Sequence, residues 1–124
     1  MKKMIAIALV FALTGLFTTT VDAKTKPALK SWSGVLIDKM CSKKMAGDMA
    51  KCSSHTKMCA SEEMCAKSGY GVMVAGKYYK FDKKGDELAA AYLKQTTKEK
   101  DMQIEVMGTM SGNKIKVTDL KDKM

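Results

Sequence analysis

The chain has 124 residues, four cysteines and a formal net charge of +9, and all 22 of its basic residues are lysines. This length accommodates one domain of ordinary size, and a hydrophobic content of 46% excludes a disordered polar chain. The lack of arginine argues against sequence-specific nucleic-acid recognition, because bidentate contacts with phosphates and guanines are mainly made by arginine.

The first 23 residues have the pattern of a secretory signal peptide. Two lysines precede an apolar run over residues 4–17, and Val21 and Ala23 place small residues at the −3 and −1 positions of a cleavage site. The apolar run covers about 14 residues, whereas a membrane-spanning helix needs about 20. We therefore expect cleavage between Ala23 and Lys24 and a periplasmic or secreted protein without a membrane span.

The remaining residues predict a flexible basic lead over 24–31 and a single domain over 32–124. Alternating apolar residues and turn signals divide this domain into short strands, and one alanine-rich segment has high helix propensity. The predicted strands cover residues 32–38, 70–75, 78–81, 102–106 and 114–120. The predicted helix covers residues 87–94 and is capped by Asp86, after a loop over 82–85.

The order of these elements predicts a mainly β fold. Five strands with one helix between the third and the fourth match a small Greek-key barrel of the OB type. An open five-stranded sheet covered by one helix has the same order of elements and is the alternative. Residues 39–68 form a partly helical, Cys/Met-rich insertion after the first strand, a position where OB barrels often bind ligands.

All the unusual chemistry lies in this insertion, which holds Cys41, Cys52, Cys59, Cys65 and the only histidine, His55. Four cysteines in a small exported protein favour two disulfides, for which three pairings are open.

A metal site is the rival interpretation, because thiolates and imidazole bind Zn²⁺ and soft sulfur ligands favour Cu(I). The spacing His55-x3-Cys59 places two ligands within one helical turn. The expected copper or zinc ligands are Cys41, His55, Cys59 and Cys65, with Met58, Met64 and Cys52 as additional candidates.

A continuous helix over 39–52 would place Cys41, Met45, Met49 and Cys52 on one face. Such a sulfur stripe suits Cu(I), but stripes of this kind more commonly mark the face of a helix that packs on the core.

Several motifs together resemble a group of small exported bacterial proteins. The matching segments are Asp38-x-x-Cys41-Ser42, His55-Thr56-x-x-Cys59-Ala60-x4-Cys65, Ser68-Gly69-Tyr70-Gly71-Val72, residues 76–82, and Val106-x-Gly108-Thr109 with Gly112 and Ile115-Lys116-Val117. The resemblance covers nearly all of the chain after residue 23 and implies an OB-like fold in a secreted protein. Cys52 lies outside this pattern.

The sequence therefore predicts an exported binding module rather than an enzyme, since it has no phosphate-binding loop, no Cys-x-x-Cys redox pair and no oxyanion motif. The expected partner is a metal ion or an unidentified envelope component. A disulfide-stapled interaction domain without metal is the alternative. Binding of single-stranded nucleic acid or another anionic ligand, for which OB barrels use aromatic residues and a basic groove, is a third and weaker hypothesis.

Overall fold

The computed structural model describes residues 28–123 of the chain. The predicted signal peptide and the first half of the predicted basic lead, residues 24–27, lie outside the described residues. Within residues 28–123, no helix combines the length and apolar character that crossing a membrane requires.

Five strands form one mixed sheet that closes on itself in the order β1-β2-β3-β5-β4. The strands are β1 (Lys30–Asp38), β2 (Tyr70–Val74), β3 (Lys77–Phe81), β4 (Gln103–Ser111) and β5 (Lys114–Asp122). All neighbouring pairs are antiparallel except β3 and β5, which run parallel and share only two registered residue pairs. The five predicted strands are confirmed, although β1 begins two residues earlier than expected and β4 and β5 extend further.

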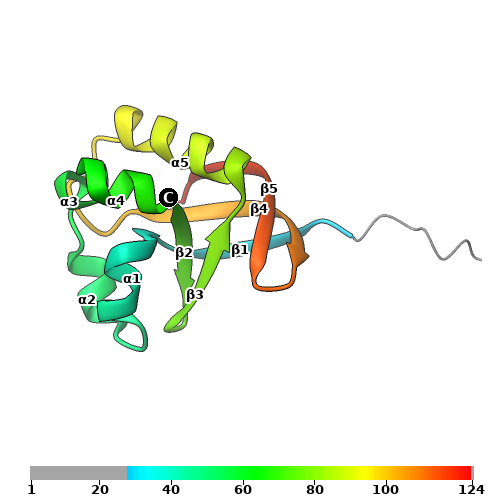
Figure 1. Cartoon of the computed structure of the whole chain (residues 1–124), viewed down its shortest axis with the longest axis horizontal. Helices are drawn as coiled ribbons and strands as arrows, with labels where there is room; N and C mark the ends of the chain where they lie inside the picture. Colours follow the sequence, from blue (N-terminus) through cyan, green and yellow to red (C-terminus); the bar gives the residue numbers. More distant parts are fainter. Residues whose placement is uncertain (1–27, 124) are drawn as a thin grey trace, which may run out of the picture.

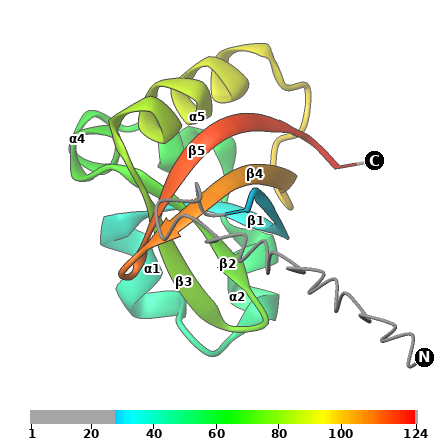
Figure 2. The same ribbon diagram turned by 90° about the vertical axis from the view of Figure 1, so that its right-hand side faces the viewer.

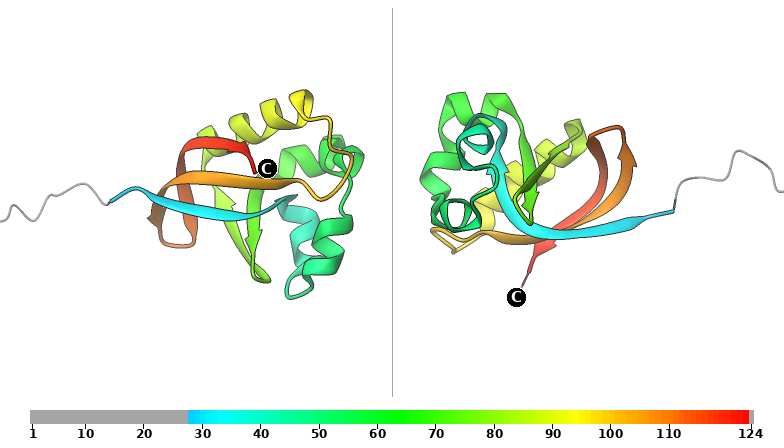
Figure 3. Two further views of the ribbon diagram at one scale, coloured as in Figure 1. Left: turned by 180° about the vertical axis from the view of Figure 1, so that it is seen from behind. Right: turned by 90° about the horizontal axis from the view of Figure 1, so that it is seen from below.

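The helices lie in two groups around this sheet. Four short helices, α1 (Lys39–Met45), α2 (Met49–Ser54), α3 (Lys57–Ser61) and α4 (Glu63–Ser68), gather at one end of the sheet (Figure 1). The longer α5 (Lys83–Gln95) connects β3 to β4 and runs along another side (Figure 3). The insertion after the first strand was predicted to be partly helical. It consists of four short helices joined by brief connections.

The two faces of β1 carry different parts of the core. Leu36 points into the main cluster inside the closed sheet, together with residues from the other strands and α5. Val35 and Ile37 point outward into a second cluster, which α1 and α2 cover. Because both faces of its second half are buried, residues 35–37 of the strand form an unbroken apolar run rather than a clean alternation.

The predicted sulfur stripe belongs to this second cluster. A continuous helix over 39–52 does not form, because the chain turns at Gly47, where φ is +82°, between α1 and α2. Cys41, Met45 and Met49 nevertheless pack against buried Cys52 and the outer face of the sheet. The stripe is therefore a packing surface, as such stripes commonly are.

The start of α5 was predicted four residues too late. Asp82, not Asp86, is the N-cap, and its carboxylate accepts a hydrogen bond from the Gly85 amide at 3.0 Å. Gly85 therefore lies inside the first turn rather than in a loop. It is buried between Phe81 and Val117, where a β-carbon would overlap both side chains.

Gly108 lies at an irregularity in the pairing of β4 with β5. The register between β4 and β5 shifts between Met107 and Gly108, which marks an irregularity in the ladder. A β-carbon at Gly108 would collide with the backbone of Lys116, so only glycine permits this close approach of the two strands.

Candidate metal centre

The site is built at the junction of β1 and α1, where Asp38 ends the strand and caps the helix. Its Oδ2 accepts a hydrogen bond from the amide of Cys41 at 2.7 Å. This contact is the ordinary N-cap arrangement, in which a side-chain oxygen binds the amide three residues later. Asp38 is fully buried, so the cap also fixes a carboxylate beneath the surface.

Helix α4 packs against α1 and brings a second thiol to this carboxylate. The Sγ atoms of Cys41 and Cys65 and one carboxylate oxygen of Asp38 all lie within 4.8 Å of one another. Cys65 is buried on α4, and Cys41 is partly exposed on α1. Three donor atoms from residues up to 27 positions apart therefore converge on one point.

Hydrogen bonds at the end of α4 maintain this arrangement. The Ser68 hydroxyl donates to the carbonyl of Cys65 at 2.6 Å, and the Met40 amide donates to the same hydroxyl oxygen at 3.3 Å. The amide of Lys39 donates to the Gly69 carbonyl at 2.9 Å. The first turn of α1 is thereby tied to the last turn of α4, and the two thiols are kept close.

His55 lies on the other side of the carboxylate, in the segment between α2 and α3. Its Nε2 is 3.2 Å from Oδ1 of Asp38, and both side chains are almost fully buried. The two atoms do not meet the angular requirements of a hydrogen bond, and neither has another partner among residues 28–123. Buried polar atoms without hydrogen bonds cost about 1–3 kcal/mol each and commonly mark the position of an ion or water.

The environment lowers the pKa of the carboxyl group and raises the pKa of both thiols. Burial opposes ionisation of Asp38, but the contact with His55 and the hydrogen bond from the Cys41 amide together hold its pKa below the usual value. Burial, followed by the charge of Asp38, raises the pKa of the Cys41 thiol to about 12. Burial and the same carboxylate also raise the pKa of Cys65. Without a cation, the site is therefore one carboxylate beside two protonated thiols.

The predicted ligands are thus only partly brought together. Cys41 and Cys65 meet, and His55 contacts the carboxylate that joins them. Cys59 is exposed on α3 and is not part of this group. The additional candidates also lie outside the site. Met58 and Met64 are 76% and 69% exposed, and Cys52 is buried in the second cluster, on the outer face of the sheet.

Asp38 is the member of the site that the sequence prediction missed. The segment Asp38-x-x-Cys41 contains it, and the three-residue spacing is that of an N-cap and the amide it binds. An aspartate at the end of a strand, three residues before a cysteine in the following helix, predicts that the carboxylate and the thiol lie close together. Cys65, 24 positions further on, has no such local signal for its partner.

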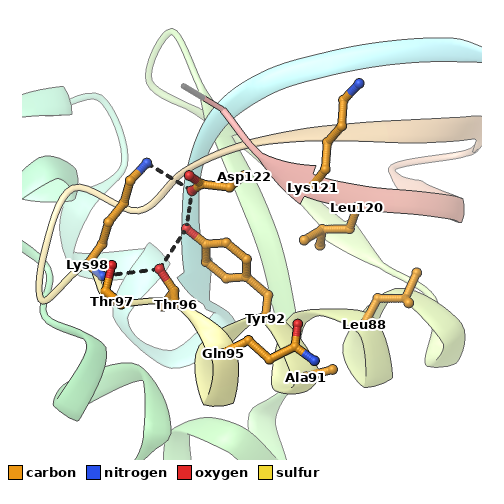
Figure 4. Close-up of a pocket in the computed structure, with 10 residues that line it drawn as sticks. All are labelled: Leu88, Ala91, Tyr92, Gln95, Thr96, Thr97, Lys98, Leu120, Lys121 and Asp122. Atoms are coloured by element: carbon orange, nitrogen blue, oxygen red, sulfur yellow. Dashed lines mark hydrogen bonds and ion pairs between the residues drawn. The ribbon is translucent and has the colours of Figure 1, made fainter.

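A separate hollow of about 620 Å³ lies between α5 and the end of β5 (Figure 4). Its polar groups already bind one another, since Asp122 Oδ1 accepts from the Tyr92 hydroxyl at 2.7 Å and lies 2.8 Å from Nζ of Lys98. The hydrogen bonds from Lys98 and Tyr92 lower the pKa of Asp122. This network joins β5 to α5, and we assign no ligand to the hollow.

The four cysteines are thiols in this structure, and no disulfide links residues of the described range. Comparison with known proteins adds no functional assignment: no protein-family model, no curated protein and no solved structure matches the chain significantly.

Proposed function

We propose that this protein is an exported metal-binding module that holds one Zn²⁺ ion through Asp38, Cys41 and Cys65. The observation that carries the proposal is the convergence of two thiols and a buried carboxylate oxygen within 4.8 Å. Around tetrahedral zinc, sulfur and oxygen ligands lie about 3.3–3.8 Å apart, so a contraction of about 1 Å suffices to bind the ion.

The donor set favours zinc over copper. Zn²⁺ accepts thiolate, imidazole and carboxylate ligands, whereas Cu(I) favours soft thiolate and thioether ligands over a carboxylate oxygen. The methionines that could bind copper are not at the site. Met45 and Met49 pack in the second cluster, and Met58 and Met64 are exposed on α3 and α4. Three protein ligands leave the fourth position of a tetrahedral ion for water or an exogenous ligand.

His55 supports this site through the carboxylate. Ligating carboxylates are generally oriented by a second group, and His55 Nε2 lies 3.2 Å from Asp38 Oδ1. His55 therefore acts as a positioning residue, and it differs in this respect from the role that the sequence suggested.

The OB type of fold and export from the cytoplasm are parts of the same proposal. The closed strand order, the parallel pairing of β3 with β5 and the position of α5 between β3 and β4 support the OB assignment. The signal-peptide pattern of residues 1–23 supports export. N-terminal sequencing of the purified protein tests the predicted cleavage before Lys24.

The metal test uses three matched cysteine substitutions in protein purified from cells that express the whole chain. Native mass spectrometry after incubation with zinc is expected to show one ion per chain. Cys41→Ser and Cys65→Ser should abolish this retention, and Cys59→Ser, which alters an exposed thiol outside the group, should preserve it. Equal loss in all three variants, or no zinc in the unaltered protein, contradicts the site.

A disulfide between Cys41 and Cys65 is the second candidate, and the same proximity of the two Sγ atoms favours it. Its formation removes two protons and transfers two electrons to an oxidant such as a disulfide-exchange protein of the envelope. Closing a loop of about 25 residues would stabilise the fold by about 3–4 kcal/mol. A denatured mass two hydrogens below the reduced value, lost in Cys41→Ser and in Cys65→Ser but kept in Cys59→Ser, together with no bound zinc, would establish this disulfide and exclude the metal site.

A further inference from the structure

A lysine-lined hollow lies on the surface between α1, β3 and the start of β5. Four lysines from these three elements surround a volume of about 390 Å³: Lys39, Lys43, Lys80 and Lys114. Lys39 and Lys43 come from α1, Lys80 from β3, and Lys114 from the start of β5, directly after the turn that joins β4 to β5 (Figure 2). The fold thus brings together positive charges from distant parts of the chain.

The four lysines form two pairs of neighbouring like charges. Lys80 and Lys114 are registered partners across the parallel β3–β5 pairing, so their side chains lie on the same face. Lys39 and Lys43 are four residues apart on α1 and share one helix face. Like charges in either position destabilise a fold. An anion seated between them would convert both repulsions into attractions.

No carboxylate of the described residues forms a direct ion pair with the cluster. Within residues 28–123, no carboxylate oxygen lies within 4.0 Å of any of the four ammonium groups. Asp86 interacts with Lys80 and Lys114 over a longer range. Its Oδ1 is already bound to the Tyr70 amide at 2.8 Å, at the start of β2.

Two neutral polar residues also line the hollow. Asn113 lies at its edge, in the turn between β4 and β5, and the ring of Tyr78 forms part of its wall. The Tyr78 hydroxyl is buried and has no hydrogen-bond partner among the described residues. Ammonium groups supply three donors each and bind phosphate oxygens as point charges.

We propose that this hollow binds a multiply charged phosphate oxyanion, as a site separate from the metal centre. The volume of about 390 Å³ suits a small group of this kind rather than a macromolecule. The net charge of +9 attracts such anions from a distance, and the four lysines supply the local contacts. The phosphate belongs either to a free polyphosphate compound or to the headgroup of an anionic lipid.

The test measures binding of inorganic tripolyphosphate by calorimetry at low ionic strength. Lys80→Gln and Lys114→Gln are expected to weaken binding at least threefold each, because each removes one charge from the hollow. Lys44→Gln is the matched control, since it removes the same charge from an exposed position on α1 that does not line the hollow.

A parallel titration with phosphatidylglycerol vesicles distinguishes the two sources of phosphate. Tripolyphosphate binding without vesicle binding identifies a free phosphate compound, and lysine-dependent binding of vesicles identifies a lipid headgroup. The proposal is overturned if neither ligand binds, or if Lys44→Gln weakens binding as much as Lys80→Gln. The latter result would indicate attraction to overall charge alone.

Discussion

Replacing Asp38 with asparagine separates its role as a helix cap from its role as a metal ligand. Asparagine caps helices as well as aspartate does, and its amide oxygen can still accept from the Cys41 amide. The free energy of unfolding in a chelator should therefore change by no more than about 1 kcal/mol. Zinc binding should weaken at least about 100-fold, the upper end of what losing a group outside the first ligand shell costs.

The zinc-dependent stability gives the expected size of the effect. At a free zinc concentration 100 times the dissociation constant, binding stabilises the folded state by about 2.7 kcal/mol. A 100-fold weaker site retains about 0.4 kcal/mol of this under the same conditions, so Asp38→Asn should lose about 2.3 kcal/mol. For a domain of this size the loss corresponds to a fall of about 10 °C in the melting temperature with zinc.

Thermal unfolding by circular dichroism, with and without a chelator, measures both quantities. Asp48→Asn is the matched control, because Asp48 caps α2 through the Lys51 amide at 3.1 Å and lies outside the metal centre. This variant should keep the full stabilisation by zinc. The assignment of Asp38 as a ligand would be refuted if Asp38→Asn kept that stabilisation too, or if both variants lost it equally.

Three further predictions concern positioning, pH and packing. His55→Ala should weaken zinc binding about 10- to 100-fold in chelator competition, because it removes the group beside the carboxylate ligand; unchanged affinity would contradict the positioning role. Because Lys98 and a tyrosine hydroxyl lower the folded-state pKa of Asp122, its stabilisation is complete above the unfolded-state pKa and is lost as pH falls through the folded-state value. Urea unfolding should therefore show a smaller loss of stability between pH 7 and pH 3 in Asp122→Asn than in the unaltered protein, and equal losses would exclude this contribution. Gly85→Ala should lower the free energy of unfolding by about 1–3 kcal/mol, because overlap with Phe81 outweighs the gain in helix propensity; stabilisation in urea titrations would show that the helix can shift.

Local patterns predicted the strands well because side chains alternate between the two faces of a sheet. Ile104 and Val106 on β4 and Ile115 and Val117 on β5 are buried, and the residues between them are more exposed. The start of α5 was missed because Gly85 reads as a loop residue when its neighbours in space are unknown. Its role follows from packing, which a local pattern does not contain.

The candidate site likewise combines one contact that is local in the sequence with others that depend on tertiary packing. The contact between Asp38 and Cys41 is local, a cap three residues long, and it was within reach of a sequence argument. The approach of Cys65 depends on how α4 folds back onto α1, and the exclusion of exposed Cys59 depends on which side of α3 faces the solvent. Cysteine spacing alone does not distinguish these two thiols.

The whole insertion occupies the place of a hairpin loop, since Asp38 and Tyr70 are directly paired across β1 and β2. The entropy of loop closure depends only weakly on loop length, so replacing the insertion with a short turn would change this entropy little. By this measure alone the insertion could be removed and the sheet would still form. The insertion nevertheless covers the outward-facing Val35, Ile37 and Met73. A chain in which the insertion detached would expose an apolar strip along paired strands, a surface prone to self-association. The helices that carry the candidate metal ligands are therefore also expected to protect the sheet from aggregation.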